Sequence, residues 1–131
     1  MKTTIQIGNT ATVTFSVIEH MQAKFDRKVI HPVCSTWDMS HQFEVAARKT
    51  LEEHLEAEEQ GIGSFLSIKH VKPAPLGANV EVVATITELG ETTVVCEIIA
   101  TINEAVCATG TQIQRVLPLS TIKRIIDEAR S

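Results

Sequence analysis

Three polar side chains in the first half of the chain have a spacing that would let them act together. Thr36, Ser40 and Glu44 follow one another at intervals of four residues, which places side chains on neighbouring turns of one helix face. The spacing also fits a structural interpretation, in which Thr36 and Ser40 cap the helix or bond back to its carbonyls and Glu44 lies at the edge of the apolar face. Both interpretations are kept at this point.

Glu44 is the member of this set with the less usual predicted environment. At ~100° per residue it falls about 20° from Trp37 around the helix, inside a predicted apolar stripe. The stripe also contains Phe43, Ala47, Leu51 and Leu55. An ionised carboxylate on a buried face is costly unless it has a partner, so Glu44 is a candidate functional residue.

His70 is expected on the inner face of a strand over residues 64–71. With the two-residue period of a strand it shares a face with Leu66 and Ile68. An inward histidine is usually a hydrogen-bonded structural residue, but opposite a carboxylate and a hydroxyl it is a candidate general base or orienting group. A carboxylate, an imidazole and a hydroxyl together are able to perform hydrolytic acyl transfer. Thr36, Glu44 and His70 are therefore the candidate catalytic residues.

The other reactive side chains indicate less. The five histidines contain no HExxH pair, so no metal site is predicted. The three cysteines are an odd number without CxxC spacing, which is typical of reduced thiols. Cys34 precedes the helix start, where a thiolate would be stabilised, or it is buried and inert. Gly61 and Gly63 either turn the chain or expose a backbone N–H to a ligand carbonyl.

The first half of the chain predicts one strand and two helical segments. A strand is expected over residues 11–18, followed by one or two helical turns over 19–26. A long helix begins after a cap at Ser35 and continues to about residue 59, because this stretch is rich in helix formers and lacks Gly and Pro. Gly61 and Gly63 are expected to end it.

The second half predicts four strands and a final helix. Residues 64–71, 79–88, 92–102 and 105–117 are rich in Val, Ile and Thr, and short turns join the last three into an antiparallel meander. A helix over 121–130 carries its apolar residues on one side. The sequence therefore predicts one α+β domain over residues 1–131, a five-stranded antiparallel sheet covered by the long helix.

Composition excludes several classes of protein. The 131 residues include 12 basic and 16 acidic side chains, with no basic run, so no nucleic-acid partner is expected. No stretch reaches the ~20 apolar residues of a membrane helix, and no membrane partner is expected. Residues 1–14 lack the layout of a signal peptide, which predicts a cytoplasmic protein. There is no P-loop and no GxGxxG motif.

Several short motifs, taken together, resemble the hotdog-fold thioesterases, and within them the fluoroacetyl-CoA thioesterase-like group. The resemblance covers nearly the whole chain. The eight-residue separation of Thr36 and Glu44 and the seven-residue separation of Gly63 and His70 match the pattern of that family. The motifs are His31-Pro-Val-x-Ser-Thr36, Glu44-x-Ala-Ala47, Gly63-x6-His70, Pro73-Ala-Pro75-x-Gly77 and Gly110-Thr111.

The resemblance implies a hotdog fold, in which an antiparallel sheet wraps around the long helix. It also implies hydrolysis of an acyl-CoA thioester by a homodimer or a dimer of dimers, with acyl-CoA sites at or near the subunit interface. No cofactor is implied, because CoA is part of the substrate.

The resemblance also assigns roles to individual residues. Glu44 would act as nucleophile or base, Thr36 would position or assist, and His70 would act as acid or base. The N–H of Gly63 would help to stabilise the oxyanion that forms at the thioester carbonyl.

This chain departs from the family pattern at the substrate-binding positions. Ile30 stands where the fluoroacetate enzyme has an aromatic gate residue, so selectivity for fluorinated substrates is not expected. Gln112 and Gln114 stand where that enzyme has His and Arg, and Arg115 is one position away. Ile30, Trp37 and Arg115, with Gly63, are the candidate substrate-binding residues. A pocket shaped by Ile30, Trp37 and Phe43 suits a short or medium acyl group.

Two other functions are weighed against hydrolysis. The same polar residues would serve a non-catalytic acyl-CoA-binding or sensing hotdog dimer, where they only satisfy the pocket. A hydratase or dehydratase is less favoured, because Asp38 has no His five residues further along the chain.

Overall fold

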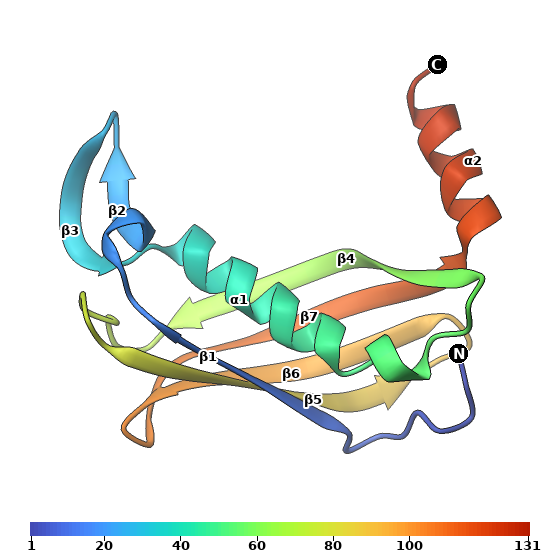
Figure 1. Cartoon of the computed structure of the whole chain (residues 1–131), viewed down its shortest axis with the longest axis horizontal. Helices are drawn as coiled ribbons and strands as arrows, with labels where there is room; N and C mark the ends of the chain where they lie inside the picture. The colour runs from blue at the N-terminus through green and yellow to red at the C-terminus, as the bar shows by residue number, and fades with distance from the viewer.

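One five-stranded antiparallel sheet forms the body of the protein in the computed structural model, which describes residues 1–131. The strand order is β1-β5-β6-β7-β4. The strands are β1 (Thr10–Ser16), β4 (Glu59–His70), β5 (Asn79–Leu89), β6 (Thr93–Ile102) and β7 (Ala105–Pro118). Helix α1 (Thr36–Lys49) lies along one face of this sheet (Figure 1). This arrangement confirms the predicted hotdog architecture.

Alternating burial explains why the sheet forms as predicted. Every second side chain of β5, from Val80 to Ile86, is buried. The same holds for β6 from Val94 to Ala100, so these strands present one apolar face to α1. Asn103 and Glu104, both with positive φ (49° and 68°), make the tight turn between β6 and β7. The predicted antiparallel meander of β5, β6 and β7 is confirmed.

Helix α1 begins as predicted but ends earlier. The Ser35 side chain accepts a hydrogen bond of 3.2 Å from the backbone N–H of Asp38, which confirms the cap. The helix stops at Lys49, ten residues before its predicted end. The Thr50 hydroxyl donates to the Ala47 carbonyl at 2.6 Å, a local bond that competes with helix continuation.

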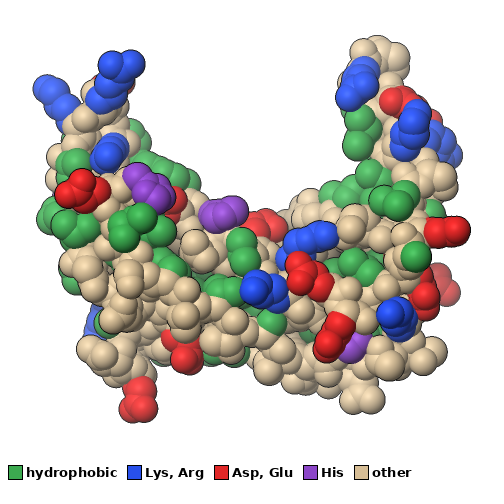
Figure 2. Space-filling model, viewed as in Figure 1, with side chains coloured by type: hydrophobic (Ala, Val, Ile, Leu, Met, Phe, Trp, Pro, Cys, Tyr) green, Lys and Arg blue, Asp and Glu red, His purple; other side chains and the backbone are tan.

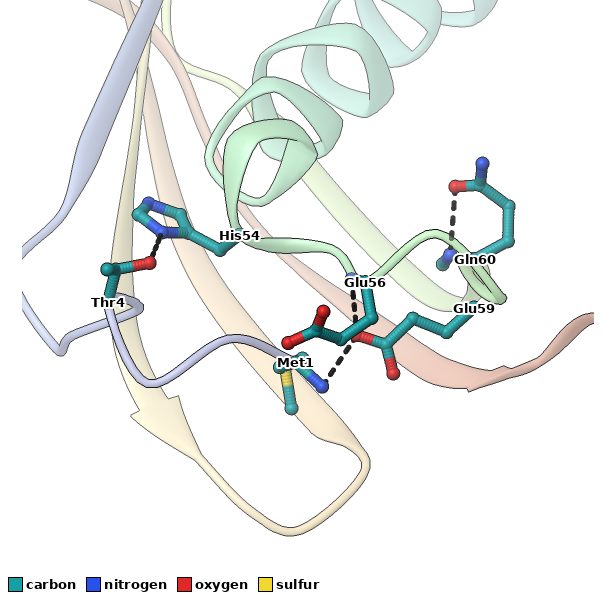
Figure 3. Close-up of polar contacts among 7 residues, drawn as sticks. Met1, Thr4, His54, Glu56, Glu59 and Gln60 are labelled. Carbon is teal, nitrogen blue, oxygen red and sulfur yellow. Dashed lines mark hydrogen bonds and ion pairs between the residues drawn. The ribbon is translucent and has the colours of Figure 1, made fainter.

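Contacts with the N-terminal segment hold the chain that follows α1. A 3-10 turn, η2, covers Glu52–His54, and the His54 Nδ1 lies 2.7 Å from the Thr4 hydroxyl (Figure 3). Glu59 Oε1 accepts from the backbone N–H of Glu56 at 2.9 Å and pairs with the Met1 ammonium at 2.6 Å. These long-range contacts override the helical propensity of residues 50–59, so the predicted long helix was wrong there.

Strand β4 therefore starts at Glu59, and the glycines expected to end the helix lie within this strand. Its pairing with β7 is interrupted by a bulge: Gly63 faces Gln114 and Phe65 faces Ile113, with Ser64 as the extra residue. A bulge of one residue changes which face the following side chains occupy. As a result, Gly63 and His70, an odd number of residues apart, both face α1.

The buried stripe of α1 differs from the predicted one. The buried residues are Met39, Phe43, Ala46 and Ala47, and at ~100° per residue their centre lies roughly 135° from Trp37. Trp37 is 50% exposed and packs edge-to-face on Phe25, with ring centroids 5.6 Å apart. Placing Trp37 in the core stripe was therefore wrong, and Glu44 lies at the flank of the true stripe.

A hairpin replaces most of the helical turns predicted over residues 19–26. Only η1 (Glu19–Met21) is helical, and β2 (Gln22–Phe25) then pairs with β3 (Lys28–Cys34). Asp26 and Arg27 have positive φ values of 51° and 66°. They form a two-residue turn of the kind that Asn-Gly usually marks, and without that signature the hairpin was missed.

Helix α2 (Leu119–Ala129) follows β7 and begins two residues before its predicted start. It extends from one end of the molecule, while the β2–β3 hairpin extends from the other end on the same side (Figure 1). No helix is long and apolar enough to cross a membrane.

Candidate active site

Glu44 faces β4 and β7 from the flank of α1. Its Oε2 accepts a hydrogen bond of 3.0 Å from Gln112 Nε2. A Cβ atom placed on Gly63 would lie 3.1 Å from the same oxygen, so the carboxylate packs directly on the strand at this glycine. Glu44, Gly63 and Gln112 together are called the Glu44 cluster below. The partner that a half-buried carboxylate requires is thus Gln112.

Gln112 and Gln114 stand at substrate-binding positions of the family pattern, but they were not among the candidate site residues predicted from the sequence. Both are buried on the inner face of β7, with exposures of 0% and 2%. Gln112 Oε1 and Gln114 Nε2 have no hydrogen-bond partner. Buried amide atoms are normally satisfied, so Gln112 keeps a free acceptor beside Glu44 and Gln114, whose side chain lies near Gly61, keeps a free donor. Two polar residues at the inward positions of a buried strand were the signal that could have found them.

Thr36 and His70 lie together at the other end of α1 and β4. They line a cavity of about 370 Å³, called the His70 cavity below. Its lining residues are Ala23, His31, Val33, Cys34, Ser35, Thr36, His70, Val71, Lys72 and Pro73. The Nε2 atom of His70 is buried without a hydrogen-bond partner. The inward orientation predicted for His70 agrees with this burial, and its Nε2 makes no hydrogen bond within the chain.

Within one chain these groups form two separate sites. With Ser64 bulged out, six ladder steps separate Gly63 from His70, or roughly 20 Å at ~3.3 Å per step. Glu44 is not among the residues that line the His70 cavity. One copy of the chain therefore brings Thr36 to His70 and Glu44 to Gly63, but it does not bring Glu44 to His70.

The remaining predicted binding residues lie apart from the Glu44 cluster. Ile30, on β3, is 50% exposed, as is Trp37 at the start of α1. Arg115 is exposed and lies on the face of β7 opposite to Gln112 and Gln114. Its side chain therefore points away from α1, whereas the two glutamines point toward it.

The cysteine in the His70 cavity is not a ready nucleophile. Burial, with a smaller contribution from the Asp38 carboxylate, raises the pKa of the Cys34 thiol to about 11. The thiol, and not the reactive thiolate, is thus the form present at neutral pH. Burial also raises the pKa of Cys96 and Cys107. No group of three or more His, Cys, Asp or Glu side chains is arranged to hold a metal ion.

A five-stranded antiparallel sheet packed on a single helix defines a hotdog-fold protein. This one carries two separate polar sites. The model of the fluoroacetyl-CoA-specific thioesterase family matches residues 17–120. The chain belongs to this family, and it is accordingly a thioester hydrolase that acts on acyl-CoA.

Solved structures agree with the hotdog fold. A Thermus thermophilus hypothetical protein, described as a thioesterase superfamily member, is 27% identical with a TM-score of 0.92, over 98% of this chain and 95% of that one. A hot-dog-like protein from Thermanaerovibrio acidaminovorans is 19% identical with a TM-score of 0.88, over 95% and 93%. A variant of the fluoroacetyl-CoA-specific thioesterase is 19% identical with a TM-score of 0.86, over 98% and 99%. A comparison with curated proteins finds no match.

Proposed function

We propose that this protein hydrolyses short- or medium-chain acyl-CoA thioesters to the free acid and CoA, with Glu44, Thr36 and His70 as its catalytic residues. The observation that carries the proposal is the Glu44 carboxylate, held by Gln112 and packed against the backbone of Gly63. A carboxylate fixed beside an exposed strand backbone is suited to attack a carbonyl carbon or to activate water for that attack. A related thioesterase variant has been solved in complex with acetyl-CoA.

The proposed site forms between two copies of the chain. Strand β4 is at the edge of the sheet, so its outer backbone groups are free to pair with another strand. An antiparallel pair of β4 strands centred on Ser67 places His70 of a second copy opposite Gly63, because the two residues lie three ladder steps on either side of Ser67. The imidazole and its neighbour Thr36 then come from one copy and Glu44 from the other.

The reaction follows from the chemistry of these groups. Where Glu44 acts as base, it takes a proton from water, and the water oxygen attacks the thioester carbon while the carbonyl electrons move onto oxygen. The Gly63 N–H stabilises that oxyanion. When the carbonyl re-forms, the carbon–sulfur bond breaks and CoA leaves as a thiolate, which His70 protonates. Where Glu44 is the nucleophile, water hydrolyses the resulting anhydride in a second step.

The test measures CoA release with a colorimetric thiol reagent over a panel of acyl chain lengths. The three cysteines are buried, so the folded protein contributes little background. We expect turnover with short and medium chains, and a loss of roughly 10²- to 10⁴-fold in kcat for Glu44→Gln. Thr36→Ala and His70→Ala are expected to lower kcat as well, with the fold unchanged by circular dichroism.

Glu56→Gln is the matched control, because it makes the same change at an exposed carboxylate. Wild-type turnover in Glu44→Gln would contradict the proposal. Tight binding of acyl-CoA without turnover across the panel would favour the non-catalytic binding or sensing dimer.

A further inference from the structure

Two groups of exposed apolar side chains lie on the arms on either side of a hollow in the molecule. The first, called the hairpin patch, lies on the β2–β3 hairpin and the start of α1. The second, called the α2 patch, lies on the C-terminal helix. Figure 2 shows hydrophobic side chains on both arms of the hollow. The hairpin patch consists of Phe25, Ile30 and Trp37, and the α2 patch of Leu119, Ile122, Ile125 and Ile126.

Both patches consist of apolar side chains that are largely exposed. The three residues of the hairpin patch are 50–60% exposed, and Leu119, Ile125 and Ile126 are 42–49% exposed. In α2 the apolar residues recur at the three- and four-residue spacing of one helix face. A helix with an apolar face that its own chain leaves uncovered indicates a contact with another surface.

The ends of β4 determine which surface that is. Leu119, the first residue of α2, donates its backbone N–H to the Glu58 carbonyl at 2.8 Å, so α2 starts beside the beginning of β4. The hairpin lies beside the other end of β4, because His31 and Val33 of β3 line the same cavity as His70. In an antiparallel pair of β4 strands centred on Ser67, the beginning of one strand at Glu59 lies four ladder steps beyond His70 of the other. The α2 of a second copy therefore approaches the hairpin of the first.

We propose that α2 of each copy packs its apolar patch on the hairpin patch of a second copy and closes the hollow beside the His70 cavity. This inference rests on the β4 pairing in the proposed function, and it adds a second copy's helix to the surroundings of the active site. The helix covers Ile30 and Trp37, so residues from two chains limit the space beside Thr36 and His70. A twofold axis makes the two contacts equivalent.

Trp37 is the sole tryptophan of the chain, and its fluorescence reports on the contact directly. The test compares wild type with Ile122→Asp/Ile126→Asp, which places charges in the α2 patch. The control, Ser120→Asp/Arg124→Asp, changes the other side of the same helix with the same spacing. Mass by analytical ultracentrifugation and thioesterase turnover are measured on the same samples.

We expect wild type and control at about twice the chain mass of 14.4 kDa, with Trp37 emission at short wavelength and weak quenching by acrylamide. In Ile122→Asp/Ile126→Asp we expect a red shift and a roughly twofold stronger quenching, because the indole loses its apolar cover. Equal fluorescence in the three proteins would overturn the inference. A monomeric wild type with a protected Trp37 would also overturn it, because the helix would then cover its own chain.

These outcomes separate the inference from the proposed function. If the dimer hydrolyses acyl-CoA but the fluorescence of Trp37 does not change with the charges in α2, the hydrolase proposal stands and the helix contact is refuted. If the protection of Trp37 depends on α2 but no acyl-CoA is hydrolysed, the helix contact stands and the hydrolase proposal is refuted.

Discussion

At Gly63 the absence of a side chain lets a carboxylate rest on a strand. We predict that Gly63→Ala lowers kcat roughly 10- to 100-fold, because the new methyl group would lie 3.1 Å from Glu44 Oε2 and 3.4 Å from Gln112 Nε2 and would displace the carboxylate. The measurement is kcat and KM alongside thermal denaturation. Gly90→Ala is the control, since its Cβ would meet Thr93 at an ordinary 3.5 Å. An unchanged kcat would show that the position of the carboxylate is not critical.

The candidate site illustrates what residue types and spacing predict and what they leave out. Thr36, Glu44 and His70 could be selected as site candidates from the sequence because their hydroxyl, carboxylate and imidazole groups are each able to take part in acyl transfer. The role of Gln112 depends on a contact between residues 68 positions apart, a distance over which local periodicity carries no information. The prediction that Trp37 belongs to the apolar stripe of α1 was wrong, because Trp37 packs on Phe25 of the β2–β3 hairpin, which was not predicted.

At the scale of elements, β4 and β7 lie so close together at Gly110 that a side chain has no space there. We predict that Gly110→Ala lowers the free energy of unfolding by at least about 3 kcal/mol or prevents folding. Its Cβ would clash with the backbone oxygen of Ser67, which cannot move without breaking the pairing of the two strands. Chemical denaturation followed by circular dichroism measures the change, with Gly90→Ala again as the control. Wild-type stability would contradict this account of the strand pair.

The elements themselves were predictable where local pattern and tertiary structure agree. The strands β5, β6 and β7 are rich in Val, Ile and Thr and are joined by short turns, and β5 and β6 alternate in burial, so the bounds of the three strands were close to the prediction. The end of α1 was not predictable, because residues 50–59 favour a helix locally and are held otherwise by contacts with the N-terminal segment. The β2–β3 turn at Asp26 and Arg27 lacks the glycine or asparagine that usually reveals such a hairpin.

For the whole molecule, the separation of the two polar sites makes a prediction about mixed dimers. If Glu44 works with Thr36 and His70 of a second copy, two inactive variants regain activity when their subunits exchange. Mixing equal amounts of Glu44→Gln and His70→Ala yields up to about one quarter of wild-type activity, since half the dimers are mixed and each carries one intact site. Glu44→Gln with Thr36→Ala behaves in the same way.

The matched control mixes Thr36→Ala with His70→Ala. These two residues line one cavity of the same chain, so every site in the mixture lacks one of them, and no activity returns. If activity returns in this control, or if it returns in neither of the two Glu44 mixtures, the three groups are divided between the chains in another way.

The extra residue in β4 also constrains how this strand could change during evolution. Adding or removing one residue between Gly63 and His70 would turn one of them to the opposite face of the sheet. Adding or removing two residues would leave both on the same face. The length of this segment is therefore expected to vary in even steps among proteins that keep both residues at work, which gives sequence alignments a simple criterion for deciding which distant relatives retain the same chemistry.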